Sequence, residues 1–321
     1  MVSGLLKHEV GDLVERCTVL ASLLEVSGYP KPGNVHRTSD MASTRFEHFL
    51  AASVSIAPAM RKLAIKGYQV GRRHLAWPEV GLGRHIFEAS RESLNWQSGG
   101  NVNTGIVLLI APLAAATGCH LSQRSAVSLE DLRGDLIEAL SAATSRDSVM
   151  IVRAIRGALS PRVLGHSSRF DVTDDNILRS VISNSVTPRV LFEECKNRDT
   201  ICSEWVTGFS LTFGRAYPAL QENLRQNGDI NRGIVHTFLQ VLSETPDSLI
   251  IRKRGFAEAV EVSRLAQQVL LRGGLDTPEG TEELRLMEQR LGSSGGELNP
   301  GTTADVIAAA IYLLLAGGWR P

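Results

Sequence analysis

The 321-residue sequence predicts an all-α protein, and three observations support this prediction. Apolar residues recur at steps of three and four, which is the spacing of one buried helix face. Alternating Val, Ile and Thr runs of the kind that form strands are almost absent. Aromatic residues make up only 5% of the chain, whereas alanine and leucine, both good helix formers, are abundant.

The predicted helices follow one another along the chain, with turn signals between them. Amphipathic stripes occur at residues 10–24, 49–63, 80–94, 106–116, 129–140 and 260–271. Glycine or proline marks turns at residues 28–33, 71, 99–100, 118, 160–161, 228, 273–274 and 292–296. We therefore expect a dozen or more helices in a single large domain, residues 1–321. Pro112 lies inside the 106–116 stripe, where it should kink the helix.

Composition and charge exclude several classes of protein. The 34 basic and 34 acidic side chains balance without a block of like charges, which argues against a nucleic-acid or anionic-membrane partner. The charged N-terminal segment cannot form the core of a signal peptide. The longest apolar run that we identify, residues 306–319, is too short to cross a bilayer. We therefore expect a cytoplasmic protein with no membrane partner.

The four cysteines, Cys17, Cys119, Cys195 and Cys202, contain no C-x-x-C pair. This scatter argues against a disulfide framework and against a zinc cluster, so we expect buried free thiols. The histidines show no H-x-x-x-H pair, and the phosphate-binding pattern G-x-x-x-x-G-K-[ST] is absent. Neither a zinc site nor an ordinary P-loop is expected.

Three polar, glycine-bearing segments break the amphipathic pattern, and the first covers residues 25–41. Two prolines stiffen this loop, and Gly33 permits a tight turn. Lys31 and Arg37 are then presented from a rigid backbone, where they suit phosphate oxygens. A loop that only ends a helix and carries solvated charges is the alternative.

The second segment, residues 98–105, leads into the helix predicted at 106–116. Its glycines leave backbone N–H groups free at a helix start, which favours an anion. Asn103 or Thr104 acting as a plain N-cap is the alternative interpretation.

The third segment, residues 295–305, opens the last predicted helix. Thr302 and Asp305 have the spacing of a capping box, with Asp in place of the usual Glu. A carboxylate in such a turn also suits Mg²⁺, which takes one or two carboxylates together with substrate phosphates.

Two further segments are weaker candidates. Residues 171–175 should begin a helix, with the acids complementing its dipole, although Asp171 is also a candidate for metal binding. The consecutive cations at 252–254 are interpreted as a solvated helix C-terminus.

Together, the three polar segments resemble the triphosphoribosyl-dephospho-CoA synthase family. The family motifs appear here as Glu25…PKPGNV…Asp40-Met41, as GGNVNTG at 99–105 and as NPGTTAD at 299–305, in the family order across nearly the whole chain. Residues 46–50 and 108–113 are similar to the archaeal-type branch. Two departures occur: His36 stands where the family has an acid, and Val102 interrupts the central motif.

The resemblance implies an all-helical transferase that moves the 5-triphosphoribosyl group of ATP to a hydroxyl of dephospho-CoA or a related acceptor, with release of adenine. It implies ATP as substrate and Mg²⁺ as cofactor, the metal being held by Asp40 and Asp305. Glu25 or Asp171 would act as general base, Asn103 would assist the leaving adenine, and Asp40 would take part in catalysis. Nucleotide and phosphate binding would fall to Lys31, Gly33, Arg37, Thr104, Asn299 and Thr302.

Several alternatives stay open at this point. The acceptor could belong to another coenzyme, such as tetrahydromethanopterin, and the donor could be phosphoribosyl pyrophosphate. A helical nucleotide-binding protein without turnover is the third interpretation. The partners expected are small nucleotide substrates, with a homodimer left open.

Overall fold

The computed structural model describes residues 5–159 and 169–321, and in these ranges it confirms the all-α prediction. No strand occurs there, and His36 and Ser39 form one isolated β-bridge. The helical elements are α1 (Lys7–Ser27), α2 (Phe46–Ser55), α3 (Ala57–Gly71), η1 (Trp77–Glu79), α4 (Leu82–Asn95), α5 (Thr104–Leu121), α6 (Leu129–Ala142), α7 (Ser145–Ala158), α9 (Ile177–Ser183), α10 (Pro188–Glu193), α11 (Thr200–Thr207), η2 (Thr212–Ala216), α12 (Tyr217–Asn227), α13 (Ile230–Glu244), α14 (Ser248–Arg254), α15 (Phe256–Leu271), α16 (Pro278–Gly292) and α17 (Gly301–Ala316).

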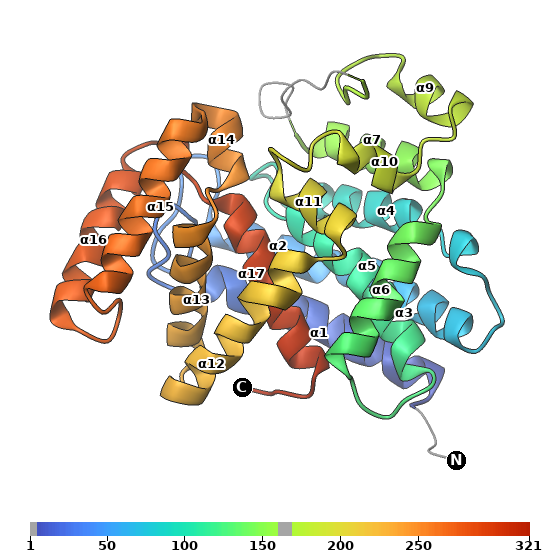
Figure 1. The fold of residues 1–321 in the computed structure, drawn as a ribbon, viewed down its shortest axis with the longest axis horizontal. Helices are drawn as coiled ribbons and strands as arrows, with labels where there is room; N and C mark the ends of the chain where they lie inside the picture. Colours follow the sequence, from blue (N-terminus) through green and yellow to red (C-terminus); the bar gives the residue numbers. More distant parts are fainter. Residues whose placement is uncertain (1–4, 160–168) are drawn as a thin grey trace.

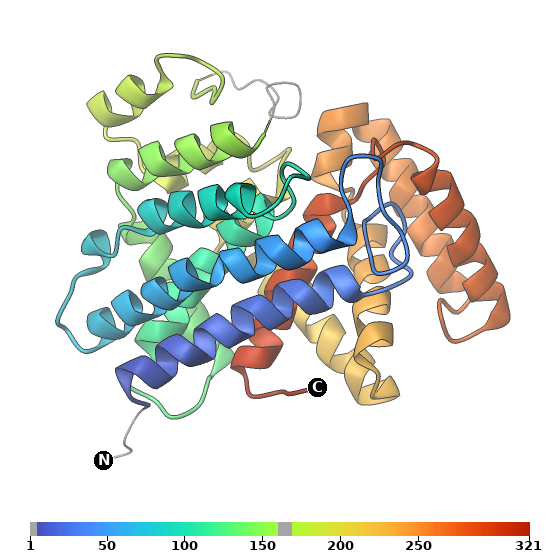
Figure 2. The same cartoon turned by 180° about the vertical axis from the view of Figure 1, so that it is seen from behind.

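Two groups of helices flank a central pair, α5 and α17. Figure 1 shows α13, α14, α15 and α16 gathered on one side, with α17 running between this group and the rest of the molecule. From behind, α1, α3, α4 and α7 form a stack in which each helix contacts the next (Figure 2). The single-domain prediction stays a prediction, although one cluster of buried apolar side chains extends from α1 to α17.

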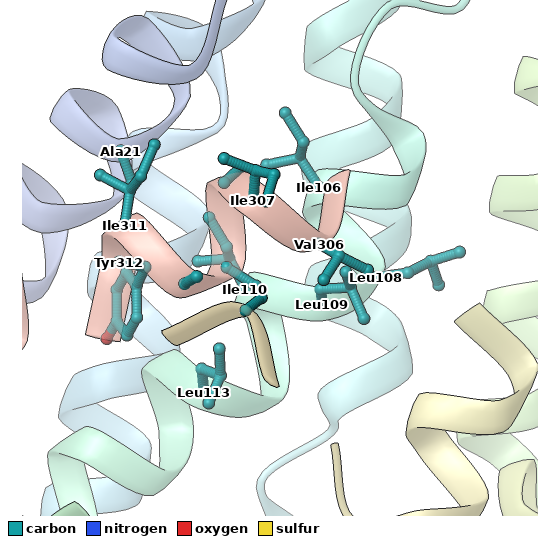
Figure 3. Close-up of a cluster of buried hydrophobic side chains, with 14 of the residues drawn as sticks. Ala21, Ile106, Leu108, Leu109, Ile110, Leu113, Val306, Ile307, Ile311 and Tyr312 are labelled. Carbon is teal, nitrogen blue, oxygen red and sulfur yellow. The ribbon is translucent and has the colours of Figure 1, made fainter. Parts of the chain in front are cut away.

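The core is built around α5 and α17, because both helices are apolar on nearly every side. Side chains of α5, α17 and α1 belong to one buried apolar cluster, in which Figure 3 draws Val306 of α17 next to Leu109 of α5 and Ile311 of α17 next to Ala21 of α1. Each fully buried aliphatic side chain of this kind contributes about 1.5–3 kcal/mol. The pairing therefore holds the starts of α5 and α17 in fixed positions.

By length and composition, α5 could cross a bilayer. The sequence predicts a helix here, but only residues 306–319 were considered as a possible membrane span. However, 94% of α5 is buried inside the protein, as expected for the core helix of a globular fold. Its apolar surface is covered by neighbouring helices.

Two local predictions were wrong. The stripe at 49–63 is divided between α2 and α3, which meet at Ile56, because Pro58 occupies the first turn of α3 and cannot donate a helical hydrogen bond. Gly118 lies within α5 rather than in a turn. A Cβ atom at Gly118 would lie 2.0 Å from the Ala64 carbonyl oxygen, so this glycine permits close packing of α3 against α5. The predicted turn at 160–161 lies outside the described residues.

The helix α5 continues through Pro112. Proline has no N–H, so the carbonyl of Leu108 loses its usual partner four residues later. The indole Nε1 of Trp205, on α11, donates to this carbonyl at 3.0 Å. A side chain distant in sequence therefore replaces the missing backbone bond.

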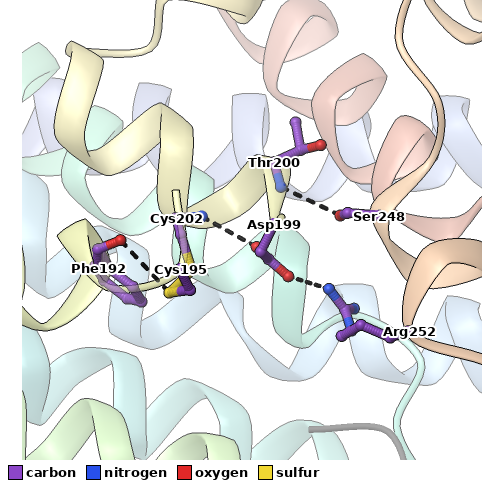
Figure 4. The surroundings of a disulfide bond; sticks show 7 residues. All are labelled: Phe192, Cys195, Asp199, Thr200, Cys202, Ser248 and Arg252. Atoms are coloured by element: carbon purple, nitrogen blue, oxygen red, sulfur yellow. Dashed lines mark hydrogen bonds and ion pairs between the residues drawn. A yellow bond between two sulfur atoms is a disulfide. The ribbon is translucent and has the colours of Figure 1, made fainter. Parts of the chain in front are cut away.

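The prediction of four free thiols was wrong for one pair, because Cys195 and Cys202 form a disulfide between the end of α10 and α11 (Figure 4). The turn between the two helices brings their Cα atoms to 5.8 Å, which is within the usual range for a disulfide. Cys17 and Cys119 are free and buried, as expected.

Candidate active site

The three polar segments converge on one cavity of about 700 Å³. Both core helices begin at this cavity, so their N-terminal turns face it. The residues that the segments contribute to its lining are Glu25, Asn34, Val35, Met41, Asn101, Val102, Thr104, Gly105, Gly295, Gly296, Glu297, Asn299, Gly301, Thr302, Ala304 and Asp305.

The predicted site residues divide into two groups. Five of them line the cavity: Glu25, Thr104, Asn299, Thr302 and Asp305. The others are not among its lining residues: Lys31, Gly33, Arg37, Asp40, Asn103 and Asp171.

Lys31 lies behind Glu25 rather than in the cavity. It is 1% exposed, its Nζ donates to the Glu25 backbone carbonyl at 2.6 Å, and the two side chains form an ion pair. Burial raises the pKa of the Glu25 carboxyl, and the adjacent Lys31 charge opposes this rise. The lysine thus holds a buried carboxylate at the cavity wall.

Asp305 is placed against the start of α5. A Cβ atom at Gly105 would lie 1.9 Å from an oxygen of the Asp305 carboxyl, which explains the glycine in the central segment. Loss of hydration raises the pKa of Asp305 well above its ordinary value, and the nearby charge of Glu25 raises it further. These two carboxyl groups therefore lie within electrostatic range in one cavity.

Asp40 and Arg37 make contacts at the surface, outside the cavity lining, and Arg37 also donates to the Oδ1 of Asn231 on α13 at 3.1 Å. The Oδ1 atom of Asp40 accepts from the Phe46 backbone N–H at 2.9 Å, at the start of α2. Arg37 lies over the Tyr29 ring, 4.6 Å from its centroid, and donates to the Ser27 carbonyl at 2.7 Å. In this structure both side chains organise the early loop.

The prediction that residues 171–175 begin a helix was wrong: α9 starts at Ile177 with Asn176 as its N-cap, no acid lies in its first turn, and Asp171 lies in the turn before it. Its Oδ1 atom accepts from the backbone N–H and the hydroxyl of Thr173, at 2.8 and 2.6 Å.

Asn103 is the N-cap residue of α5, but its side chain makes no capping bond. Its Oδ1 accepts from the hydroxyl of Ser93, and its Nδ2 has no partner within the described ranges. The Oδ1 of Asn101 instead accepts from the Thr104 N–H at 3.2 Å.

The capping-box interpretation of Thr302 and Asp305 was wrong, because no side chain of the late segment caps α17. Asp247, which begins α14, supplies the cap from outside: one carboxylate oxygen accepts from the Thr303 N–H at 2.7 Å and from its hydroxyl at 2.8 Å. The other oxygen accepts from the N–H groups of Leu249 and Ile250. Asp305 is thereby left available to the cavity.

The interpretation of residues 252–254 as a solvated helix end was wrong for two of the three cations. Arg252 and Lys253 both line the cavity. Arg252 forms an ion pair with Asp199, and Lys253 donates to the Gly296 carbonyl at 2.8 Å. Burial lowers the pKa of Lys253. The available sequence signal was that these cations directly follow an apolar pair, Ile250 and Ile251, in a short helix.

The disulfide-closed turn forms another part of the wall, which the sequence did not indicate. Asp199 caps α11 by accepting from the Cys202 N–H at 3.0 Å, while its second oxygen contacts Arg252 (Figure 4). The Thr200 N–H donates to the hydroxyl of Ser248 at 3.2 Å. These bonds tie the turn to the start of α14.

A large part of the cavity wall is apolar. Its side chains come mainly from α7, from the residues before α9 and from α10: Ile155, Leu159, Phe170, Val172, Leu191 and Phe192. Charged groups therefore cover only part of the cavity, and an uncharged portion of a ligand would fit the remainder.

The expected Mg²⁺ pair, Asp40 and Asp305, is divided, since only Asp305 lines the cavity. Over residues 5–159 and 169–321, no group of three or more His, Cys, Asp or Glu side chains is arranged to hold a metal ion.

A helical scaffold that lines one cavity with buried carboxylates, cations and glycine-bearing turns has the groups of a transferase acting on phosphorylated substrates. Residues 12–320 match the family model of ATP:dephospho-CoA triphosphoribosyl transferase. The chain therefore belongs to this transferase family, whose reaction uses ATP as a substrate.

Similar proteins agree with this assignment. The 2-(5''-triphosphoribosyl)-3'-dephosphocoenzyme-A synthase of Klebsiella pneumoniae is 26% identical, with 97% of this chain and 92% of that protein covered. A protein of Malonomonas rubra named for the same activity is 27% identical, with 95% and 87% covered. A crystal structure from Archaeoglobus fulgidus, described as a triphosphoribosyl-dephospho-CoA synthase, has a TM-score of 0.60 at 23% identity over 84% of this chain and all of that one. This last similarity shows a shared fold.

Proposed function

We propose that the protein transfers the 5-triphosphoribosyl group of ATP to a hydroxyl of dephospho-CoA and releases adenine. The observation that carries this proposal is the convergence of three distant polar segments, each matching a family motif, on one cavity with buried carboxylates. The acceptor oxygen forms a bond to C1 of the ribose, and the bond from C1 to the adenine nitrogen breaks. The general base takes the proton of the hydroxyl and the departing adenine takes up one proton, so adenine leaves as a neutral base and no proton is gained or lost overall.

The triphosphate is assigned to the part of the cavity where Arg252, Lys253 and the glycines at 295–296 meet. Guanidinium and ammonium groups are the usual partners of phosphate oxygens. The N-terminal turns of α5 and α17 also face the cavity, and helix N-termini favour anions. The apolar wall would receive the uncharged arm of the acceptor.

Glu25 is assigned as the general base, one of the two candidates from the sequence. Burial raises the pKa of its carboxyl group, which makes the carboxylate a stronger base than an exposed glutamate. Lys31 orients it from behind through the buried ion pair. The carboxylates near C1 would also stabilise the positive charge that develops there during displacement.

Asp305 is assigned as the Mg²⁺ ligand, together with phosphate oxygens of ATP. Its carboxyl group lies at the cavity wall close to Arg252, whose charge opposes the rise in the pKa of Asp305. A divalent cation bound there would neutralise part of the negative charge of the ATP triphosphate. Asp40, which accepts from the start of α2, is not needed for this arrangement.

We further propose that the protein acts in the cytoplasm, where ATP is available. A homodimer stays a prediction, for which light scattering of the purified chain is the direct measurement.

The primary experiment measures adenine release from ATP and Mg²⁺ by chromatography, with and without dephospho-CoA. Adenine that appears only with dephospho-CoA supports the proposed reaction. Adenine that appears only with a pterin precursor would mean that the acceptor is this precursor and not dephospho-CoA. Measurable ATP binding without adenine release would indicate a non-catalytic protein.

Variants then test the assigned roles. Arg252→Ala and Lys253→Ala should each raise the KM for ATP about tenfold or more, since each removes a charged hydrogen bond to phosphate. The exposed neighbour Arg254 supplies the matched control, and Arg254→Ala should leave KM unchanged.

Glu25→Gln should lower kcat about 10²–10⁴-fold. Unchanged adenine release by Asp305→Asn over a Mg²⁺ titration would reject the metal assignment.

A further inference from the structure

Two asparagines on the cavity wall each carry one buried polar atom without a hydrogen-bond partner. These atoms are the Nδ2 of Asn34 and the Oδ1 of Asn299, judged within the part of the chain that the structure describes. Asn34 is 9% exposed, so bulk water does not satisfy its amide. A buried amide group without a partner is costly, so these two atoms point to a ligand that completes their hydrogen bonds.

The two asparagines come from loops that are pressed together. A Cβ atom at Gly33 would lie 2.9 Å from the Leu298 carbonyl oxygen and 3.0 Å from Pro300, the residues on either side of Asn299. Gly33 also has φ of 76°, a conformation that L side chains rarely adopt. The early and late loops therefore present one unpaired donor and one unpaired acceptor to the same cavity.

We propose that Asn34 and Asn299 form an amide pair that binds the edge of the ATP adenine and selects this base as the leaving group. Adenine presents a ring nitrogen that accepts a hydrogen bond beside a 6-amino group that donates one. Asn34 would donate to the ring nitrogen, and Asn299 would accept from the amino group. This inference rests on the proposed function and adds the residues that determine donor specificity.

The neutral chemistry of the pair favours the base over the other parts of ATP. The triphosphate requires cations, which Arg252 and Lys253 supply elsewhere on the wall. Inosine triphosphate provides a sharp comparison, because a carbonyl oxygen replaces the 6-amino group and the sugar and phosphates are unchanged. That oxygen would face the Oδ1 of Asn299, so both groups would be acceptors.

The experiment compares ATP with inosine triphosphate as donor, at fixed dephospho-CoA, by the release of adenine or hypoxanthine. The readout is the ratio of the two kcat/KM values. Asn299→Ala should lower the preference for ATP about tenfold. Asn299→Asp keeps an acceptor oxygen and should retain the preference. Asn34→Ala should lower kcat/KM for both donors. Asn227→Ala, at the exposed end of α12, is the matched control and should change neither ratio nor rate.

Calorimetric binding of ATP and inosine triphosphate without acceptor keeps the inference testable even if no turnover occurs. A wild-type preference for ATP that Asn299→Ala abolishes supports the amide pair, whatever the acceptor. An ATP preference that is unchanged in both alanine variants would overturn the assignment of the amide pair to adenine. 3′-Deoxy-ATP is the third ligand: if the variants lose discrimination only against this nucleotide, the pair binds the ribose and the assignment is also overturned. If the wild type binds ATP with the amide-dependent preference but releases no base, the proposed reaction is rejected and the amide pair is retained. Thermal unfolding of each variant establishes that it is folded.

Discussion

Among single residues, two carboxyl groups of the cavity lining, Glu25 and Asp305, and one in the N-cap beside it, Asp247, share a raised pKa. Glu25, Asp247 and Asp305 each have a raised pKa because burial disfavours the charged form. Glu25 is compensated by an ion pair and Asp247 by four hydrogen bonds. Asp305 has neither among the described contacts, which marks it as the group whose charge a substrate or cation must balance.

This difference predicts how stability depends on pH. In the unfolded chain Asp305 titrates near its ordinary pKa of 3.8, whereas the folded chain keeps the proton to higher pH. The folded state binds this proton more tightly, so the contribution of Asp305 to stability is fully present below about pH 4 and is lost as pH rises through the folded pKa.

Asp305→Asn should therefore raise the free energy of unfolding by about 0.5–2 kcal/mol at neutral pH, and the gain should shrink as pH falls toward 4. Urea unfolding at several pH values measures it. Glu130→Gln, at an exposed position, should produce a small change. A gain from Asp305→Asn that is independent of pH would contradict the proposed cause.

At the scale of elements, Asp247 joins two helices by capping both. It accepts from N–H groups at the start of α14 and from Thr303 in the first turn of α17. The start of α17 carries Asp305 and Thr302, so this cap positions one side of the cavity.

Asp247→Ala should lower the free energy of unfolding by about 2–4 kcal/mol, since it removes a cap and leaves buried donors unpaired. The comparison is Asp229→Ala, which removes the cap of α13 at an exposed position and should cost about 1 kcal/mol. Urea unfolding measures both. Equal costs would mean that the bonds to α17 add nothing.

The bond from Trp205 to the Leu108 carbonyl predicts coupling between two distant positions. Trp205→Phe leaves this carbonyl unpaired and should cost about 1–3 kcal/mol. In a Pro112→Ala background the restored backbone N–H can reach the same carbonyl, so the cost should be smaller. A double-mutant cycle by urea unfolding should show this coupling, and strict additivity would argue against it.

At the scale of the whole molecule, close backbone packing between α3 and α5 sets how near the flanking stack approaches the core. A Cβ atom at Gly67 would lie 1.8 Å from the Ala115 carbonyl oxygen, and one at Gly118 would lie 2.0 Å from that of Ala64. These contacts are with backbone atoms, so a side chain can be admitted only if one helix shifts.

Gly67→Ala and Gly118→Ala should each destabilise the protein by about 1–3 kcal/mol, as expected for overpacking. Gly134→Ala is the matched control, because this glycine lies within α6 with nothing near its Cβ position. It should stabilise the protein by about 0.5–1 kcal/mol, since alanine is the better helix former. Thermal unfolding measures all three, and a stabilising effect at position 67 would contradict the packing described.

Much of the fold could be predicted because helical periodicity is a local property of the chain. The stripes at 10–24, 129–140 and 260–271 fall within α1, α6 and α15. The family could be predicted because its motifs are contiguous in sequence. The roles of individual site residues were harder to predict. Lys31 has the charge of a phosphate ligand, but only the fold shows that its Nζ is buried behind Glu25.

Periodicity and short motifs were enough to establish that the chain is helical, which segments carry polar motifs and which family they resemble, because these features are local in the chain. Tertiary structure alone decided which of those residues meet. It placed Glu25 and Asp305 in one cavity within electrostatic range, brought Arg252 and Lys253 to the same cavity and capped α17 from Asp247. The reason is that the burial, ion pairing and pKa of a side chain depend on its neighbours in space, and many of these neighbours are brought into contact only by the packing of the helices.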